Sequence, residues 1–493
     1  MRNSRCAAKC DSGCNQCGDM SRRAFVKTAS ASLVSASLVG GLFSGRPALA
    51  QKIQPNGPAS KHVPAIRACF VRRKGDYGMR WPGQIYDGEA ARKKYIEQIT
   101  AAAKELGVKL DLQPIPLYSM EEGEAWVAQS VEAKPDGLLL VLLDRQEHAW
   151  PTANAATDCG IPTVVFSPIG SSFTTNTAPL SKKPGSFICS TDDFRQVNHG
   201  MKMLQAGAKM RATRCLVIKG NKRADGEIPH LGIKLRTVPA QVFMEEYEKT
   251  PVDDDVQAMA KDLIQRAEKM IGATEQDVIN GIKSYVVASR LMEREECDAI
   301  TMDCLGALGK TKISLPCIAW SKMNDDGIPA ACEADLGAMA THVIVQYLCG
   351  RPGFQQDPVG ETAREAVIGA HCCCPTKLGG VDAPPEPYDI LHHHGVRDAT
   401  ARPVWKIGQR VTSADVLLAG QDAPPKMIIS VGEVLENISV PPAGGCVVSV
   451  MVKFDGVSDV LAYPGFHQVF FYGDFKRELT QFCQLFKIEP MVV

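Results

Sequence analysis

Short continuous hydrophobic runs alternate with helix-like spacing in the first part of the chain. The runs "IRACFV" (66–71), "GLLLVLL" (137–143) and "GIPTVVFS" (160–167) are almost wholly apolar, which is typical of strands buried on both faces of a parallel sheet. Residues 88–107 place apolar side chains at three- and four-residue spacing, which predicts an amphipathic helix. The alternation predicts a doubly wound α/β domain over residues 64–210.

The same kind of pattern begins again at "TRCLVIKG" (213–220). Long helical patterns follow over 253–295, and then the strand-like run "CDAITMDC" (297–304). These features predict a second α/β domain over residues 211–380. Within it, residues 331–349 predict one helix, whose buried face comprises Leu336, Ala340, Val343, Ile344 and Tyr347.

The pattern of hydrophobic residues changes after about residue 380. A proline-rich linker, "DAPPEP" (382–387), precedes short β-rich runs such as "KMIISVGEVL" (426–435), and a helical pattern over 475–486 closes the chain. This part predicts an antiparallel barrel over residues 386–493. The expected fold class is therefore α/β: two doubly wound α/β domains followed by a C-terminal antiparallel β-barrel with a final helix.

The N-terminal residues 1–50 have the pattern of an export signal. Paired arginines in "SRRAFVK" (21–27) precede a weakly apolar run of 16 residues, and "ALA" ends at residue 50 as a small-x-small cleavage signature. The run is too short and too rich in serine for a membrane span. It predicts a twin-arginine signal and a periplasmic or secreted mature chain, with no membrane association after the signal is removed. An ordinary amphipathic helix is the alternative.

Composition adds few constraints. The 493 residues are 45% hydrophobic and 22% charged with a formal net charge of zero, which is typical of a globular protein and gives no electrostatic reason to expect nucleic acid as a partner. The 18 cysteines include four within residues 6–17 and the run 372–374. Their disulfide pairing cannot be read from the sequence.

Two carboxylates and one histidine are candidates for a metal site. Glu333 shares the buried face of the predicted helix, Asp357 follows a helix-breaking loop, and His467 lies among apolar residues of a predicted strand. A buried carboxylate requires a partner or a metal, and this donor set suits Mn²⁺ or Mg²⁺ better than structural zinc. Ordinary structural roles remain open for all three: a satisfied buried glutamate, a turn aspartate and a core histidine.

The segment "ACEADLGAMATHVIVQYLCGRPGFQQD" (331–357) resembles a signature of the L-fucose/L-arabinose isomerase superfamily, in its fucose-isomerase-like branch. "IGAHCC" (368–373) and "PGFHQVFFYGDFKRELTQFCQLFKIE" (464–489) are similar to two further family elements. The chain departs from the family at "DCLGALGK" (303–310), which lacks the aromatic residue and the acid usual there.

The resemblance implies Glu333, Asp357 and His467 as ligands of Mn²⁺ (or Mg²⁺). It also implies Glu333 and Asp357 as the catalytic acid–base pair that interconverts an aldose and a ketose through an enediol, in a homo-oligomer. Two further residues are candidates for substrate binding: Trp81, in an aromatic loop after the first strand, and His371. An ordinary packed loop is the alternative for Trp81, and an exposed loop is expected for the histidines at 392–394.

The leading hypothesis is thus an exported, metal-dependent sugar isomerase-like enzyme of carbohydrate metabolism with a small-molecule sugar substrate. The alternative is a non-catalytic exported carbohydrate-binding protein on the same scaffold, because paired α/β domains also resemble periplasmic sugar binders. A third hypothesis is an interaction protein that has the same fold but binds no metal.

Overall fold

The computed structural model describes residues 54–75, 87–145, 147–393, 397–439 and 446–493. The predicted signal peptide (1–50) and Trp81 lie outside these residues. Among the described helices, none has the length and apolar character needed to cross a membrane.

The first sheet is parallel throughout and has the strand order β2-β1-β3-β4-β5. Its strands are β1 (Ala65–Val71), β2 (Lys109–Leu112), β3 (Gly137–Leu142), β4 (Thr163–Ser167) and β5 (Ser186–Ser190). The associated helices are α1 (Pro58–Lys61), α2 (Gly88–Leu106), α3 (Met120–Ala133), α4 (Ala149–Asp158), α5 (Thr174–Ser181) and α6 (Arg195–Ala212).

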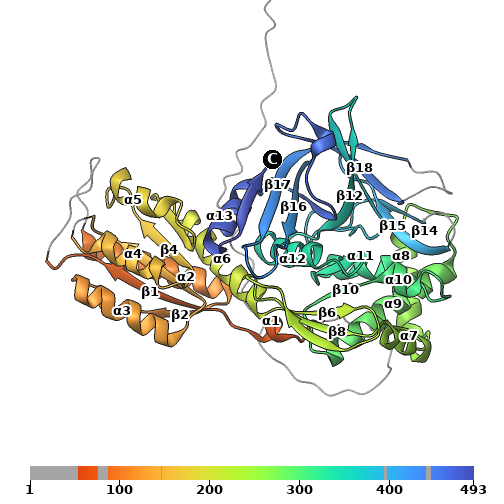
Figure 1. Ribbon diagram of the computed structural model, residues 1–493, viewed down its shortest axis with the longest axis horizontal. Helices are drawn as coiled ribbons and strands as arrows, with labels where there is room; N and C mark the ends of the chain where they lie inside the picture. Colours follow the sequence, from red (N-terminus) through yellow and green to blue (C-terminus); the bar gives the residue numbers. More distant parts are fainter. Residues whose placement is uncertain (1–53, 76–86, 146, 394–396, 440–445) are drawn as a thin grey trace, which may run out of the picture. The chain divides into compact units, whose positions relative to one another are not determined.

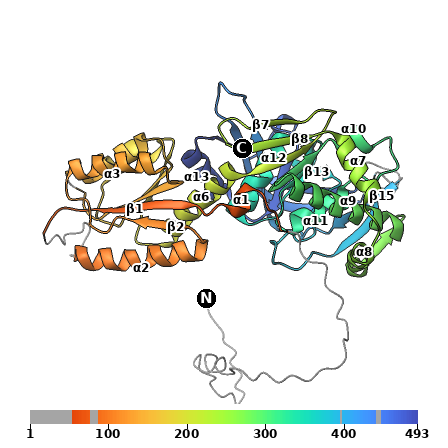
Figure 2. The same cartoon turned by 90° about the horizontal axis from the view of Figure 1, so that it is seen from below.

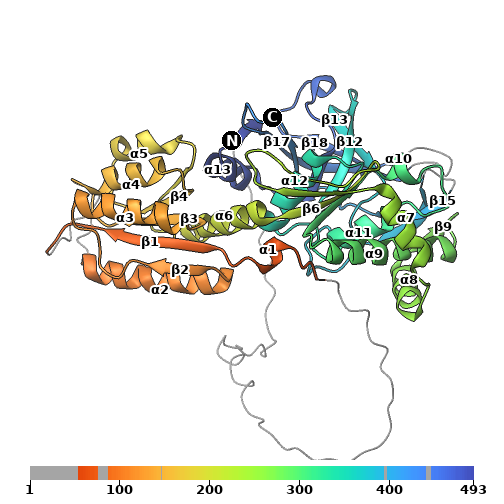
Figure 3. The same ribbon diagram turned by 60° about the horizontal axis from the view of Figure 1, so that its bottom comes forward.

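Both faces of this sheet are covered by helices, as the continuous apolar runs predict. Phe70 of β1 packs with residues of α2 and α6, whereas its neighbour Val71 packs with Trp126 of α3 and Trp150 of α4. Figures 2 and 3 show α2 and α3 on opposite sides of β1. Successive strand residues point to opposite faces, so each strand contributes to two cores and must be apolar throughout.

The second sheet has the order β11-β10-β6-β8-β7, and only the edge strand β7 is antiparallel. Its strands are β6 (Arg214–Ile218), β7 (Ala224–Glu227), β8 (Lys234–Val238), β10 (Ala299–Met302) and β11 (Ala330–Cys332). The helices of this region are α7 (Ala240–Lys249), α8 (Asp254–Arg266), α9 (Glu275–Arg294), α10 (Cys304–Leu308), α11 (Cys317–Asp325) and α12 (Leu336–Ile344), which continues as the π-helical turn η1 (Val345–Cys349).

A closed six-stranded antiparallel barrel follows, in the order β16-β19-β12-β13-β18-β17, with β17 pairing back to β16. Its strands are β12 (Phe354–Glu361), β13 (Ala366–His371), β16 (Arg410–Leu417), β17 (Lys426–Asn437), β18 (Val448–Phe454) and β19 (Gln468–Tyr472); β20 (Glu489–Val492) adds to β17 in parallel. The final helix is α13 (Lys476–Phe486) and a short 3-10 turn, η2 (Val460–Ala462), precedes β19.

The barrel draws strands from both sides of the predicted boundary at 380–386, because β12 and β13 precede it in the sequence. Residues just after the linker form a separate sheet of β9 (Lys269–Ile271), β14 (Tyr388–His393) and β15 (Arg397–Pro403). The predicted barrel is confirmed as an element of the fold, and the domain boundaries themselves stay predictions.

The predicted helix over 331–349 is wrong at its start. The chain leaves β11 through Glu333 and Ala334, whose φ angles of 61° and 54° lie in the left-handed region, and helix α12 begins at Leu336 with Asp335 as its N-cap. Glu333 therefore lies in a tight turn and not in the first turn of a helix. Hydrophobic spacing marks the buried face of α12 but carries no information about this turn.

Buried His342 on α12 makes the protein sensitive to acid. Burial lowers the pKa of its imidazole to about 3, with a smaller contribution from His371. Since the unfolded chain takes up this proton near pH 6.5, the stability that neutral His342 contributes is present above pH 6.5. It is lost as the pH falls towards 3, at roughly 1.4 kcal/mol per pH unit.

We expect the variant His342→Gln to lose this part of the pH dependence. Urea unfolding at pH 7, 6, 5 and 4 measures it: the free-energy difference between wild type and variant shrinks at each step towards acid. Parallel curves for the two proteins would refute the assignment.

Candidate functional site

The acidic site, which we define as Glu333, Asp357 and His467, is assembled from three separate elements. Glu333 leaves the carboxyl end of β11, Asp357 lies within β12, and His467 directly precedes β19. The Nε2 atom of His467 lies 3.5 Å from Glu333 Oε2 and 3.2 Å from Asp357 Oδ1. The structure thus brings together three residues that are up to 134 positions apart in the sequence.

Two of these residues hold unusual backbone conformations. Glu333 has a φ of 61° and His467 a φ of 47°, and non-glycine residues in this region cost free energy that the surrounding structure must offset. The turn before His467 is held by Asp415 of β16, whose Oδ2 accepts a hydrogen bond from the Phe466 amide at 3.3 Å. Strain of this kind clusters at functional sites.

Asp335 orients the imidazole of His467 through the ring nitrogen that faces away from Glu333 and Asp357. Its Oδ2 lies 2.9 Å from His467 Nδ1, and its Oδ1 accepts from the Ala338 amide at 2.8 Å as the α12 cap. A carboxylate on one ring nitrogen leaves the other nitrogen directed at the acidic site, an arrangement that commonly orients metal-binding histidines.

His371, at the end of β13, adjoins the acidic site. Its Nε2 lies 3.8 Å from Glu333 Oε1, and its ring centre is 5.8 Å from that of His467. One ligand atom each from Glu333, His371 and His467 falls within 4.8 Å of the others. Four of the five predicted site residues are therefore neighbours, while Trp81 lies outside the described residues. Their roles as ligands or catalysts stay predictions.

The charges of the acidic site are poorly balanced. Burial opposes charge on His467, but the hydrogen bond that it donates to Asp335 and the nearby carboxylates of Asp357 and Glu333 outweigh burial and raise the pKa of the imidazole to about 11. The hydrogen bond from His467 lowers the pKa of Glu333. Within the described ranges, no lysine or arginine forms an ion pair with these three carboxylates. Imidazolium is thus the main countercharge to three acids.

A divalent cation fits this arrangement. Asp357 Oδ1 is buried and accepts no hydrogen bond of good geometry from the described part of the chain, although it faces His467 Nε2. Two carboxylates and one imidazole are donors that oxygen-preferring divalent ions accept. Glu333, Asp357 and His467 would hold such an ion, and the ion would neutralise the excess negative charge.

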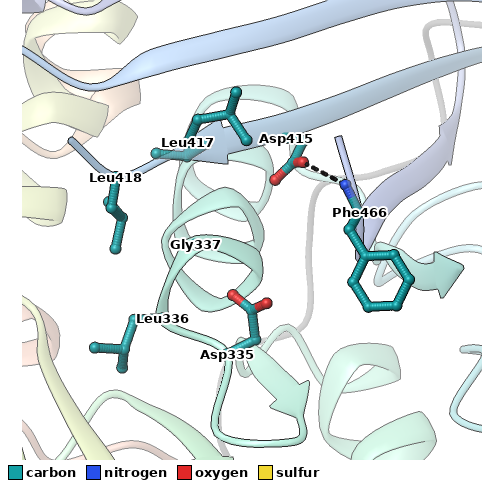
Figure 4. Close-up of a pocket in the computed structure, with 8 residues that line it drawn as sticks. Asp335, Leu336, Gly337, Asp415, Leu417, Leu418 and Phe466 are labelled. Atoms are coloured by element: carbon teal, nitrogen blue, oxygen red, sulfur yellow. Dashed lines mark hydrogen bonds between the residues drawn. The ribbon is translucent and has the colours of Figure 1, made fainter. Parts of the chain in front are cut away.

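A pocket of about 420 Å³ opens beside the acidic site, and Asp335, which contacts His467, lines it (Figure 4). Asp335, Asp415 and the ring of Phe466 line it, together with Leu336, Gly337, Val416, Leu417 and Leu418. Burial raises the pKa of Asp415 to about 7, so near neutral pH its carboxyl group both donates and accepts hydrogen bonds. The volume falls within the range of small-molecule sites.

Sequence reasoning missed the three polar and aromatic residues of this pocket. Asp415 carries a usable signal, because a carboxylate between Ala414 and Val416 in a predicted strand must face a partner or a cavity. Phe466 carries no such signal, because the 60% exposure of its side chain is known only from the structure. Asp335 is recognisable only once the turn at Glu333 is known.

Comparison with known proteins identifies no family. No family model and no curated protein matches the chain. Among solved structures, a sugar-binding protein of a sugar ABC transporter from Bacillus halodurans is 15% identical over 61% of this chain and 91% of its own, with a TM-score of 0.18. GanP, a glucose-galactose binding protein from Geobacillus stearothermophilus, is 16% identical over 59% and 92%, with a TM-score of 0.19. The XylFII molecule is 14% identical over 49% and 79%, with a TM-score of 0.17.

These comparisons contradict the expected membership of the L-fucose/L-arabinose isomerase superfamily. No family model supports it, and two of the neighbours named above are described as sugar-binding proteins, not as isomerases. The short matching segments are common combinations of a turn acid, a helix and a glycine break. The predicted isomerase activity and its manganese-dependent chemistry are therefore withdrawn. Because these TM-scores are so low, neither the fold nor the ligand of these neighbours can be assigned to this chain.

Proposed function

We propose that the chain binds a small carbohydrate without converting it, in the pocket beside the acidic site. One observation supports this proposal most directly: Asp335 lines the pocket, and its carboxylate also contacts Nδ1 of His467 in the acidic site. A ligand in the pocket therefore lies next to a cluster of carboxylates that favours a cation.

The pocket supplies the groups that recognise sugars. Carboxylates accept hydrogen bonds from hydroxyl groups, and hydrogen bonds to charged groups contribute about 1.5–3 kcal/mol each. Asp335 and Asp415 offer such acceptors from two sides. The exposed ring of Phe466 supplies an apolar face for the C–H side of a sugar ring.

A divalent cation in the acidic site would add a second recognition element. Its chemistry when bound is the coordination of neighbouring hydroxyl oxygens, which distinguishes sugars by the stereochemistry of adjacent hydroxyls. Glu333, Asp357 and His467 would hold it, and Asp335 would keep His467 oriented. The identity of the ion as Mn²⁺ or Mg²⁺ stays a prediction from the two carboxylates and one imidazole.

The proposed location is the periplasm or the outside of the cell, and it depends on the predicted signal in residues 1–50. A sugar receptor in that compartment requires a ligand site that is open to solvent. Glu333 of the neighbouring acidic site has 36% of its side chain exposed. The predicted homo-oligomer stays a prediction.

Binding of a sugar panel to the purified chain tests the proposal. We expect calorimetry to detect binding of one or a few aldoses or ketoses. Asp415→Asn should weaken binding about 10-fold or more, because an NH₂ group replaces one of the two carboxyl oxygens that can accept a hydrogen bond from the sugar. The matched control is Asp422→Asn, on the exposed loop after β16, which should leave affinity unchanged. A panel without any binding sugar, or equal affinity of Asp415→Asn and wild type, would contradict the proposal.

A further inference from the structure

Three thiols converge behind the acidic site, and we name Cys304, Cys332 and Cys373 the thiol cluster. Cys332 ends β11, Cys304 begins α10 directly after the neighbouring strand β10, and Cys373 follows β13 by two residues. Since β10 and β11 are adjacent and parallel, with Met302 opposite Cys332, their carboxyl ends bring the first two thiols together. All three cysteines are buried.

The contacts of the thiol cluster lead from Cys304 through Cys332 and Cys373 to the imidazole of His371. The thiols of Cys304 and Cys373 lie close enough to Cys332 to raise the pKa of its thiol, and Cys373 Sγ lies 3.6 Å from Nδ1 of His371. β13 ends at His371, and a bend at Cys372 brings Cys373 back towards the ring of His371. One ligand atom each from Cys332, His371 and Cys373 falls within 4.8 Å of the others.

Buried free thiols often serve only as small apolar groups in a core. Cys374 is such a case: its thiol lies in the barrel core with Trp405 and contacts a neighbouring backbone carbonyl. The thiol cluster differs because an imidazole nitrogen joins it. A tetrahedral zinc with Zn–S bonds of about 2.3 Å and Zn–N bonds of about 2.0–2.1 Å holds its sulfur and nitrogen ligands roughly 3.6 Å apart.

We propose that Cys332, Cys373 and Nδ1 of His371 form a zinc site, beside which Cys304 supplies a further thiol. Thiolate and imidazole ligands favour zinc over the oxygen-preferring ions. Each thiol releases its proton to solvent as the metal binds, and the oxidation state of sulfur and metal is unchanged. His371 then separates two sites of different chemistry, since its Nε2 faces Glu333. The zinc site does not depend on sugar binding.

Cobalt titration of the reduced, chelator-treated full chain tests this proposal. Co²⁺ bound to thiolates shows an intense near-ultraviolet charge-transfer band, which Co²⁺ in the acidic site would lack because that site has no sulfur. We expect one equivalent to produce the band and Zn²⁺ to abolish it by displacement. Absence of the band in wild type would overturn the proposal, whatever the result for sugar binding.

Two variants localise the site. We expect Cys373→Ala to weaken Co²⁺ binding by at least about 100-fold, the upper end of what loss of a supporting residue costs, while the adjacent Cys374→Ala keeps the band. Circular dichroism checks that both variants fold. Equal loss in both variants would overturn the proposal, as would a Cys332–Cys373 or Cys304–Cys332 disulfide, found by mass spectrometry, in chain isolated from the producing cells.

Discussion

Replacement of Glu333 by Gln is expected to lower the affinity of the chain for a divalent cation by at least about 100-fold, since loss of merely supporting residues costs up to that factor. The amide keeps the size of the side chain and the left-handed turn but removes a full negative charge from the acidic site. Sugar affinity measured in the presence of the cation should fall with it. Because Glu333 is one of the exposed members of the site, unfolding without cation should change little.

Glu365→Gln is the matched control for this variant. Glu365 also has a left-handed backbone, with a φ of 47°, but its carboxylate pairs with Lys453 on the barrel surface at 3.1 Å. Calorimetry with Mg²⁺ and Mn²⁺ should give wild-type affinity for the control. If Glu333→Gln binds both ions as wild type does, Glu333 is not a ligand.

The variant Phe470→Ala is expected to destabilise the protein by about 3–5 kcal/mol, the usual cost of removing a buried phenylalanine. Phe470 lies in the barrel core, fully buried, with its ring centre 5.6 Å from that of Phe454. The barrel strands carry Asp357 and fix the position of His467, so loosening them should also weaken cation binding. Urea unfolding measures the loss.

Phe466→Ala serves as the stability control. It removes the same ring four residues earlier, from a side chain that is 60% exposed, and such substitutions usually change stability by less than about 0.5 kcal/mol. The same variant should weaken sugar binding, because Phe466 lines the pocket. A loss of stability in Phe470→Ala as small as that expected for Phe466→Ala would show that the barrel core does not depend on Phe470.

Much of the fold could be predicted from hydrophobic patterns alone. Continuous apolar runs indicated parallel strands with two covered faces, and the packing of Phe70 and Val71 into different cores bears this out. The short runs near the C-terminus indicated the barrel. The pairing of β12 and β13 with strands about 100 residues later could not be read, because strand partners are set by long-range contacts.

The site was predicted less completely. The sequence suggested Glu333, Asp357 and His467 because charged residues in apolar surroundings need partners, and the structure places them side by side. It did not suggest Asp415 or Asp335, since a pocket wall is made by elements whose approach is a tertiary property. The family resemblance misled the functional assignment: short motifs report a local turn and helix, not a reaction.

Anomalous diffraction from crystals soaked in Mn²⁺ tests the central claim most directly. The account predicts a manganese peak bonded to Glu333, Asp357 and His467 Nε2, with Asp335 on the opposite ring nitrogen. A well-ordered acidic site without such a peak, with manganese bound only elsewhere, would contradict it.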